Sequence, residues 1–364
     1  MCEALRASIG KDAAAEGVEP TERPAVIEYL MQRFEKETFT RSTLPLPDAP
    51  STPDWCNYAD EVRLRGSLRA LLPHLQGEPA THGSTSGAAN SSEGMFLDAP
   101  EHGTLTMEDT SAGRLPVICC GSRADFVRMV CTLARRNGAQ VPDSMGALLI
   151  NNYWSAACQD RYLAEVISRG RAAVVKAVKR EDFRDCFAIV GPGPYSGIPS
   201  ELVFLDNEEW LQMSLALRKS HECVHYLTRR LYGSMHIHLH DELLADYGAM
   251  VSVTGAFRPD WCRLFFFGAG AQSAIPGRAE SYMPVRFSAA ARACVTRVLR
   301  TAVDTLAAFA ARFGQRWLPS QGEYTACLCS IASLSLAELA QVDAVAKLHR
   351  LYDHQVSRSG EGNP

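Results

Sequence analysis

The sequence predicts an α+β fold that combines a small mixed sheet with long helices. Segments with helical spacing of apolar residues stand before and after a central group of short apolar runs, and the two kinds do not alternate regularly. Hydrophobic residues at 46% and charged residues at 21% are ordinary for a globular protein. A length of 364 residues is enough to bury a large core.

The N-terminal part of the chain predicts helices between two flexible stretches. Residues 1–22 are small, polar and charged, so we expect a flexible N-terminus. A helical N-terminal segment is expected over residues 23–76, because "PAVIEYLMQRFEKETF" and "ADEVRLRGSLRALLPHL" have apolar residues at helical spacing. A disordered linker or loop is expected over residues 77–110, because its first part consists mainly of Gly, Ser, Thr, Ala and Asn.

Residues 111–358 are expected to form the main domain, followed by a flexible tail at 359–364. Short apolar runs bounded by turn residues predict four strands: "LPVICCG", "MGALLINNYW", "FAIVG" and "SELVFLD". Ser122 and Gly138 bound a helix after the first run, as N-cap and stop. Cys120, between this strand and this helix, is expected to be a packing residue rather than a nucleophile.

The longest predicted helix runs from Asn207 to about Tyr232. Asp206 or Asn207 can cap it, acidic residues occupy its first turn, basic residues occupy its last turn, and Gly233 ends it. A second helix follows in "DELLADYGAMVSVTG". Two alanine- and leucine-rich helices are expected near residues 288–313 and 334–356.

Charge and composition argue against several classes of protein. A formal net charge of −4 gives no general attraction to nucleic acid or to an anionic membrane. The chain has no run of about 18 apolar residues, the length that a membrane span would need. The first residues also lack the apolar core of a secretory signal. The twelve cysteines are scattered, which is typical of reduced thiols. We therefore expect a cytoplasmic protein without nucleic-acid or membrane partners.

The chemistry of the chain is concentrated in "HECVH", residues 221–225. On a helix, His221 and His225 lie on one face and can bind one ion, while Glu222 can take a proton from a water on that ion. Glu242 can supply a third ligand, since 16 residues are enough to end the first helix, turn and return on a second. Asp246, four residues further on, can orient a ligand histidine.

This pattern, His221–Glu–x–x–His225 followed by Glu242–x–x–x–Asp246, resembles the gluzincin group of zinc metallopeptidases over about residues 219–248. The resemblance implies a zincin-like catalytic domain. It also implies a Zn²⁺ ion held by the two histidines and Glu242, with Glu222 as the general base. The implied reaction is hydrolysis of a peptide or a small amide-containing substrate.

Other residues are candidates for supporting roles. An oxyanion or substrate contact is expected from one of four downstream side chains: His240, Tyr247, Tyr282 or Arg286. The run "SELVFLD" is the candidate edge strand for an extended substrate.

Several alternatives remain open at this point. His236, His238 and His240 would share a face on an extended strand and form a rival metal site, although ordinary loop positions are expected for them. The Glu222–x–x–His225 pair also fits a di-iron bundle, but the chain lacks a second ExxH. A zincin-like enzyme with non-proteolytic tailoring activity on a small molecule or modified peptide is a further possibility. So is a binding module without turnover.

Overall fold

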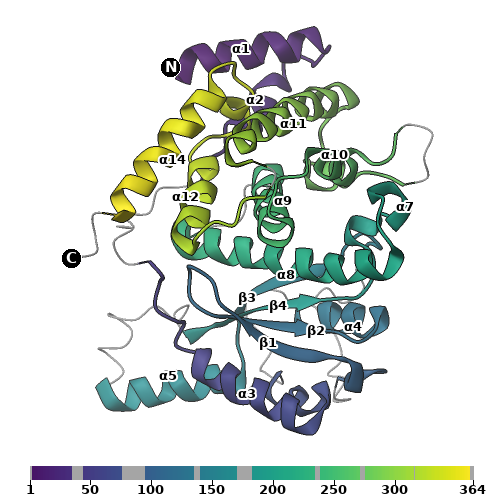
Figure 1. Ribbon diagram of the computed structural model, residues 1–364, viewed down its shortest axis with the longest axis vertical. Coiled ribbons are helices and arrows are strands. Elements are labelled where there is room, and N and C mark those ends of the chain that lie inside the picture. Colours follow the sequence, from purple (N-terminus) through teal and green to yellow (C-terminus); the bar gives the residue numbers. More distant parts are fainter. Residues whose placement is uncertain are drawn as a thin grey trace. The chain divides into compact units, whose positions relative to one another are not determined.

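The computed structural model describes residues 2–34, 44–75, 95–134, 140–169, 183–233, 238–270, 275–314 and 316–360. The α+β class is confirmed, since the described chain is mostly helical and contains a four-stranded mixed sheet (Figure 1). It divides into two compact units. The first unit comprises residues 1–45 and 196–364, and the second comprises residues 46–195. This division differs from the predicted boundary near residue 110.

The sheet belongs to the second unit. Its strands are β1 (Thr104–Glu108), β2 (Leu115–Cys119), β3 (Ala147–Tyr153) and β4 (Asp185–Val190), in the order β1-β2-β4-β3. The central pair, β2 and β4, is parallel, whereas β1 and β3 pair antiparallel with their neighbours. Three of these strands match predicted runs. Strand β1 lies instead in the expected linker, because only Leu105 of its five residues is buried and the apolar signal is weak.

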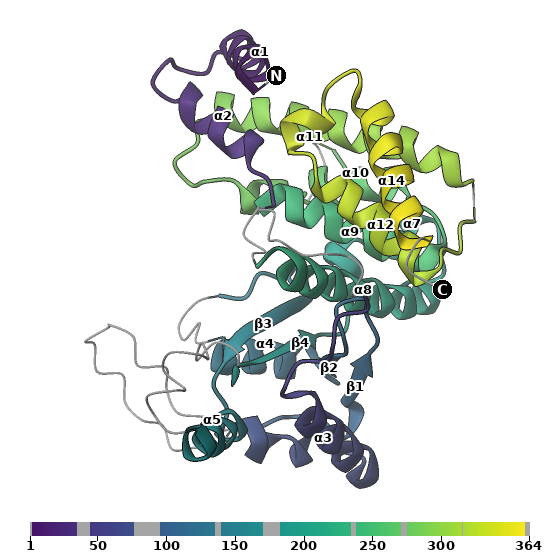
Figure 2. The same cartoon turned by 90° about the vertical axis from the view of Figure 1, so that its left-hand side faces the viewer.

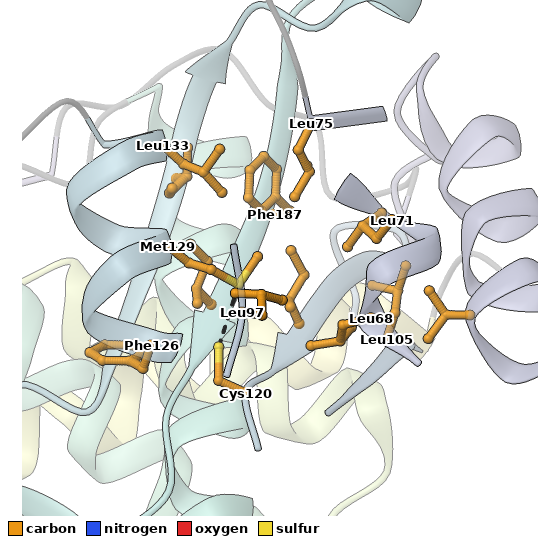
Figure 3. Packing of buried hydrophobic residues seen from close by; sticks show 14 of the residues in the cluster. Leu68, Leu71, Leu75, Leu97, Leu105, Cys120, Phe126, Met129, Leu133 and Phe187 are labelled. Carbon is orange, nitrogen blue, oxygen red and sulfur yellow. Dashed lines mark hydrogen bonds between the residues drawn. The ribbon is translucent and has the colours of Figure 1, made fainter. Parts of the chain in front are cut away.

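Helices pack on one face of this sheet, and the core of the second unit lies between them and the strands. The helices of the second unit are α3 (Thr52–Arg65), α4 (Arg123–Leu133) and α5 (Ala156–Arg169), with 3-10 turns at Leu68–Ala70, Leu72–Leu75 and Pro100–His102. Phe187 and Ile189 alternate along β4 toward a buried cluster that includes Phe126 and Met129 of α4 (Figure 3). Cys120 lies in the same cluster, where burial raises the pKa of its thiol. It is a packing residue, as expected.

In its described part, the first unit is built from helices joined by loops. Its N-terminal helices are α1 (Cys2–Ala15) and α2 (Arg23–Met31), which lie beside α11 (Ala289–Ala310) (Figure 2). The remaining helices are α7 (Ser200–Val203), α8 (Asn207–Tyr232), α9 (His238–Thr254), α10 (Pro259–Phe267), α12 (Gln321–Ala332), α13 (Leu336–Leu339) and α14 (Ala344–Gly360), with 3-10 turns at Tyr195–Gly197, Ala279–Tyr282 and Ala311–Phe313. Within the described residues, no helix combines the length and apolar character needed to span a bilayer.

Two local predictions are wrong. Helix α1 occupies the N-terminus expected to be flexible, because Ile9 and Ala13 are buried within the first unit. The run "SELVFLD" is not a strand. Its first residues form α7, which Phe204 ends in the left-handed region at φ 57°.

Helices α8 and α9 approach each other closely at Gly248 of α9. A Cβ atom at this position would lie 2.6 Å from Val224 Cγ2 of α8 and 2.8 Å from the Tyr324 hydroxyl of α12. The missing side chain therefore allows the two helices that carry the sequence motif to pack against each other.

Candidate metal centre

Helix α8 places the first half of the motif. The Asp206 carboxylate accepts from the backbone N–H groups of Glu208 (2.8 Å) and Glu209 (3.4 Å), and Gly233 ends the helix at φ 69°. Both ends are as predicted. His221, Glu222 and His225 are all buried on this helix, with exposed fractions of 4–6%.

Helix α9 places the second half. Glu242 and Asp246 are one turn apart and therefore share a face of the helix. The Asp246 side chain is fully buried, and that of Glu242 is 15% exposed. The predicted return on a second helix is thus present, and it brings both carboxylates to α8.

Three donor groups converge between the two helices. The Nε2 atoms of His221 and His225 are 2.9 Å apart. The Glu242 carboxylate lies 3.5 Å from Nε2 of His221 and 3.4 Å from Nε2 of His225. Donors of these three residues form a group that could hold a metal ion.

The spacing of these donors fits a zinc ion. Ligand atoms about 2.0–2.1 Å from a tetrahedral zinc are about 3.3 Å from one another, and the three observed separations bracket this value. Two imidazoles and one carboxylate, with a fourth position open, form a common ligand set of catalytic zinc. His221, His225 and Glu242 therefore match the ligand types of such a site, and both distances to the Glu242 carboxylate are close to its ligand spacing, while the two Nε2 atoms are closer together.

Each histidine of the cluster has a carboxylate at its other ring nitrogen. His221 Nδ1 is 3.1 Å from Asp246 Oδ1, the contact expected from the spacing of the motif. His225 Nδ1 is 3.3 Å from Asp241 Oδ2. The contact of His221 is a hydrogen bond, whereas that of His225 is a charge contact. A carboxylate at Nδ1 favours the tautomer that presents Nε2 to a metal. The role of Asp241 was missed, although its position directly before Glu242 was visible in the sequence.

Arg278 is a second residue that sequence reasoning missed. Its guanidinium lies 2.5 Å from Asp246 Oδ1 and 3.9 Å from the Glu242 carboxylate. It also donates to the Ser196 hydroxyl (2.5 Å), and its Cζ lies 5.0 Å from the centroid of the Phe266 ring. No motif surrounds Arg278 in the sequence, so only the fold brings it to the cluster.

The cluster contains strongly interacting charges. Burial by itself would lower the pKa of His225, but the Asp241 and Glu242 carboxylates hold that pKa well above its usual value. Burial would raise the pKa of Glu242, but hydrogen bonds with the two imidazoles hold it well below its usual value. Burial likewise opposes ionisation of Asp246, and the charge of Arg278 outweighs it, so the pKa is lowered. Glu242 and Asp246 therefore both favour the ionised form.

Glu222 differs from these carboxylates. Burial raises its pKa above the usual value, although the nearby His225 and His221 act in the opposite direction. A carboxyl group with a raised pKa holds a proton more readily than an ordinary glutamate, which suits a group that must accept and return one.

Two of the four candidates for an oxyanion contact are tyrosines in different surroundings. Burial and the charge of the neighbouring Glu242 carboxylate raise the pKa of Tyr282 well above its usual value. Tyr282 is therefore brought to the cluster. Tyr247 is buried elsewhere, with its ring against Phe257 and its hydroxyl accepting from Cys327 (3.5 Å).

The other two candidates are not part of the described cluster. Arg286 has an exposed side chain. His240 is buried against the Phe34 ring, and burial lowers the pKa of its imidazole to about 4.

The rival histidine site does not have the expected backbone. His236 lies outside the described residues. His238 and His240 belong to the first turn of α9 rather than to an extended strand, so they do not share a strand face. The His238 ring stacks on Tyr29 instead.

Comparisons with known proteins identify a family whose activity is unknown. Residues 78–343 match a family of unknown function, DUF7005, and this range includes both motif helices. No curated protein and no solved structure matches the chain significantly.

Proposed function

Since the chain belongs to the family of unknown function DUF7005, we propose its activity from the metal centre: a zinc-dependent hydrolase of the zincin type that cleaves a peptide or amide bond. His221, His225 and Glu242 hold the metal, and Glu222 is the general base. The substrate is a peptide or a small molecule with an amide bond.

One observation carries this proposal. Two imidazole Nε2 atoms and one carboxylate converge, while a separate carboxylate lies beside the Nδ1 atom of each imidazole, Asp246 at His221 and Asp241 at His225. A polar helix face without a ligand role would not need both ring nitrogens of two histidines to be directed in this way. The buried position of the cluster adds to the argument, because unpaired buried charges are costly.

The chain's own residues divide the work of such a reaction. A zinc ion in this cluster supplies a Lewis acid that acidifies water and polarises a carbonyl group. Glu222 accepts the proton from the attacking water and returns it to the leaving amine. Tyr282 and Arg278 are the nearby donors for an oxygen that gains negative charge. Asp246 and Asp241 keep the ligand imidazoles in the required tautomer.

The test is metal content, measured by mass spectrometry on protein purified without chelators or an affinity tag. The wild type is compared with His225→Ala and Glu242→Ala, and with His354→Ala as the matched control. His354 is an exposed histidine of α14 in the same unit. We expect about one zinc per chain in the wild type and the control, and loss of zinc in both site variants.

Hydrolysis is then measured with a library of internally quenched peptides. Turnover that depends on zinc and is absent from both site variants is the expected result. Wild-type protein that contains no zinc and takes none up, or zinc that survives both substitutions, would refute the proposed centre.

A further inference from the structure

A pocket lies in the first unit, on another face of α9 than the histidine cluster. It has a volume of about 520 Å³, within the ~300–1,000 Å³ typical of ligand pockets. Tyr247 and Val251 of α9 line one side, and Ala307 of α11 lines another. Trp317 and the loop that contains Phe257 complete the wall.

The side chains of the wall are aliphatic or aromatic apart from one cation. Small residues of α11 and of the loop leave the space open, and aromatic rings border it. Gly255 turns this loop at φ 74°, and its carbonyl accepts from the backbone N–H of Trp317 (2.6 Å). Arg258 is the charged side chain of the lining. It is exposed and lies over the Trp261 ring, and no ion pair joins it to a carboxylate of the described chain.

We propose that this pocket binds an apolar monocarboxylate, with the alkyl or aryl body among the aromatic and alanine side chains and the carboxylate against Arg258. An apolar wall with one polar anchor is the usual build of a small-molecule site. A guanidinium is suited to binding a carboxylate with two hydrogen bonds. Because the lining contains no acidic side chain, a ligand carboxylate meets no like charge.

This pocket is separate from the metal centre. None of the metal-ligand residues lines it. Adjacent helical residues point about 100° apart, so Asp246 contacts the histidine cluster while Tyr247 lines the pocket. The proposal therefore does not depend on the proposed hydrolase activity.

Calorimetric titration tests it with two acids, decanoate and 2-naphthoate, and with the neutral alcohols 1-decanol and 2-naphthalenemethanol. We expect at least one acid to bind the wild type roughly tenfold more tightly than its alcohol, the size of one charge-assisted contact. The acid that binds more tightly distinguishes an alkyl from an aryl ligand. Arg258→Gln should remove the preference for the acid and leave the alcohol unchanged.

Three variants control the experiment. Arg350→Gln, at an exposed arginine of α14, should change nothing. Ala307→Phe fills the pocket and should abolish binding of acid and alcohol, provided that its thermal unfolding matches that of the wild type; Val251→Phe is the second filling variant. Glu242→Ala should retain binding, because an acid held by a metal ion would be lost there.

The possible results divide clearly. A preference for the acid that disappears in Arg258→Gln and survives in Glu242→Ala supports the proposal. Absence of acid binding to the wild type overturns it. So does an acid affinity unchanged by Arg258→Gln, or binding that persists in a folded pocket-filling variant.

Discussion

Four carboxylates, those of Glu222, Asp241, Glu242 and Asp246, lie buried or nearly buried around two imidazoles and Arg278. When the two imidazoles are neutral, the form that binds a metal, such an excess of buried acidic groups is costly unless a further cation compensates it. A divalent ion between His221 and His225 would provide that compensation. The centre is therefore expected to gain stability as well as chemistry from its metal.

The role of Glu222 can be tested by Glu222→Gln, which keeps the shape of the side chain and removes its ability to accept a proton. We expect metal content to stay at the wild-type level and turnover to fall by about 10²- to 10⁴-fold. The measurement combines metal analysis with the peptide-library assay. Full activity in this variant would show that another group is the base.

The carboxylates behind the histidines can be tested by Asp241→Asn and Asp246→Asn. Each substitution weakens the contact that orients one ligand imidazole, so we expect zinc affinity to fall by about 10- to 100-fold without complete loss. Competition with a fluorescent chelator measures this. The exposed Asp353 provides the control, as Asp353→Asn. Equal affinity in all three variants would leave Asp241 and Asp246 without an orienting role.

At the scale of single residues, the sequence predicted which side chains share one face of a helix, because the helical repeat determines this. The spacing of His221 and His225, and of Glu242 and Asp246, places each pair on one helix face in any fold that keeps these helices. The contacts of Asp241 and Arg278 depend on how α9 and the residues after α10 pack against α8. No local pattern encodes that packing, so both residues had to be found in the structure.

Among the elements, α8 and α9 were predictable because they have capping residues and a regular charge pattern. Helix α12 was not predicted, because "QGEYTACLCSIA" is buried from Thr325 to its end and has no polar face to show a helical period. Helix α7 was taken for a strand because its short apolar run fits either structure. Tertiary contacts favour the helix: the indole N–H of Trp210 in α8 donates a hydrogen bond to the carbonyl of Ile198, just before α7.

Gly248→Ala tests the close approach of α8 and α9. The added Cβ would meet Val224 and Tyr324 at distances that require movement. Overpacking costs about 1–3 kcal/mol, more than the roughly 1 kcal/mol that alanine gains over glycine in a helix. We expect a lower melting temperature and weaker zinc binding. Gly322→Ala in α12 is the control, since a Cβ there meets nothing within 4 Å.

The two variants are compared by thermal unfolding and by zinc titration. Gly322→Ala should be neutral or slightly stabilising. If Gly248→Ala is equally harmless, the packing of α8 on α9 tolerates a methyl group, and the glycine is not what brings the motif helices together.

At the scale of the whole molecule, the chain is organised differently from the sequence prediction. The first unit joins residues 1–45 to residues 196–364, so its N-terminal helices belong to the same unit as the proposed metal centre rather than to a separate segment. Composition could not predict this, because α1 is rich in alanine and charge and has only a thin apolar stripe. The burial of Leu5, Ile9 and Ala13 becomes visible only when α11 and α13 are present.

Ile9→Ala tests whether α1 is an integral part of the first unit. Ile9 is 3% exposed, and removing buried atoms from isoleucine typically costs about 2–5 kcal/mol. We expect the melting temperature to fall by several degrees. Lys11→Ala, at an exposed position of the same helix, should leave it unchanged. Equal melting temperatures of the two variants would show that α1 does not contribute to the stability of the first unit.

The first unit consists of two segments that are far apart in the sequence, and this affects the order in which its parts are synthesised. Helices α1 and α2 leave the exit tunnel before any residue of α11 or α13 has been translated. At translation rates of about 5–20 residues per second, their apolar side chains stay without those neighbours for on the order of ten seconds or more. Residues 46–195 are complete during that interval. Cotranslational folding thus favours the second unit first, and α1 and α2 can bury their apolar side chains fully only after α11 and α13 have emerged.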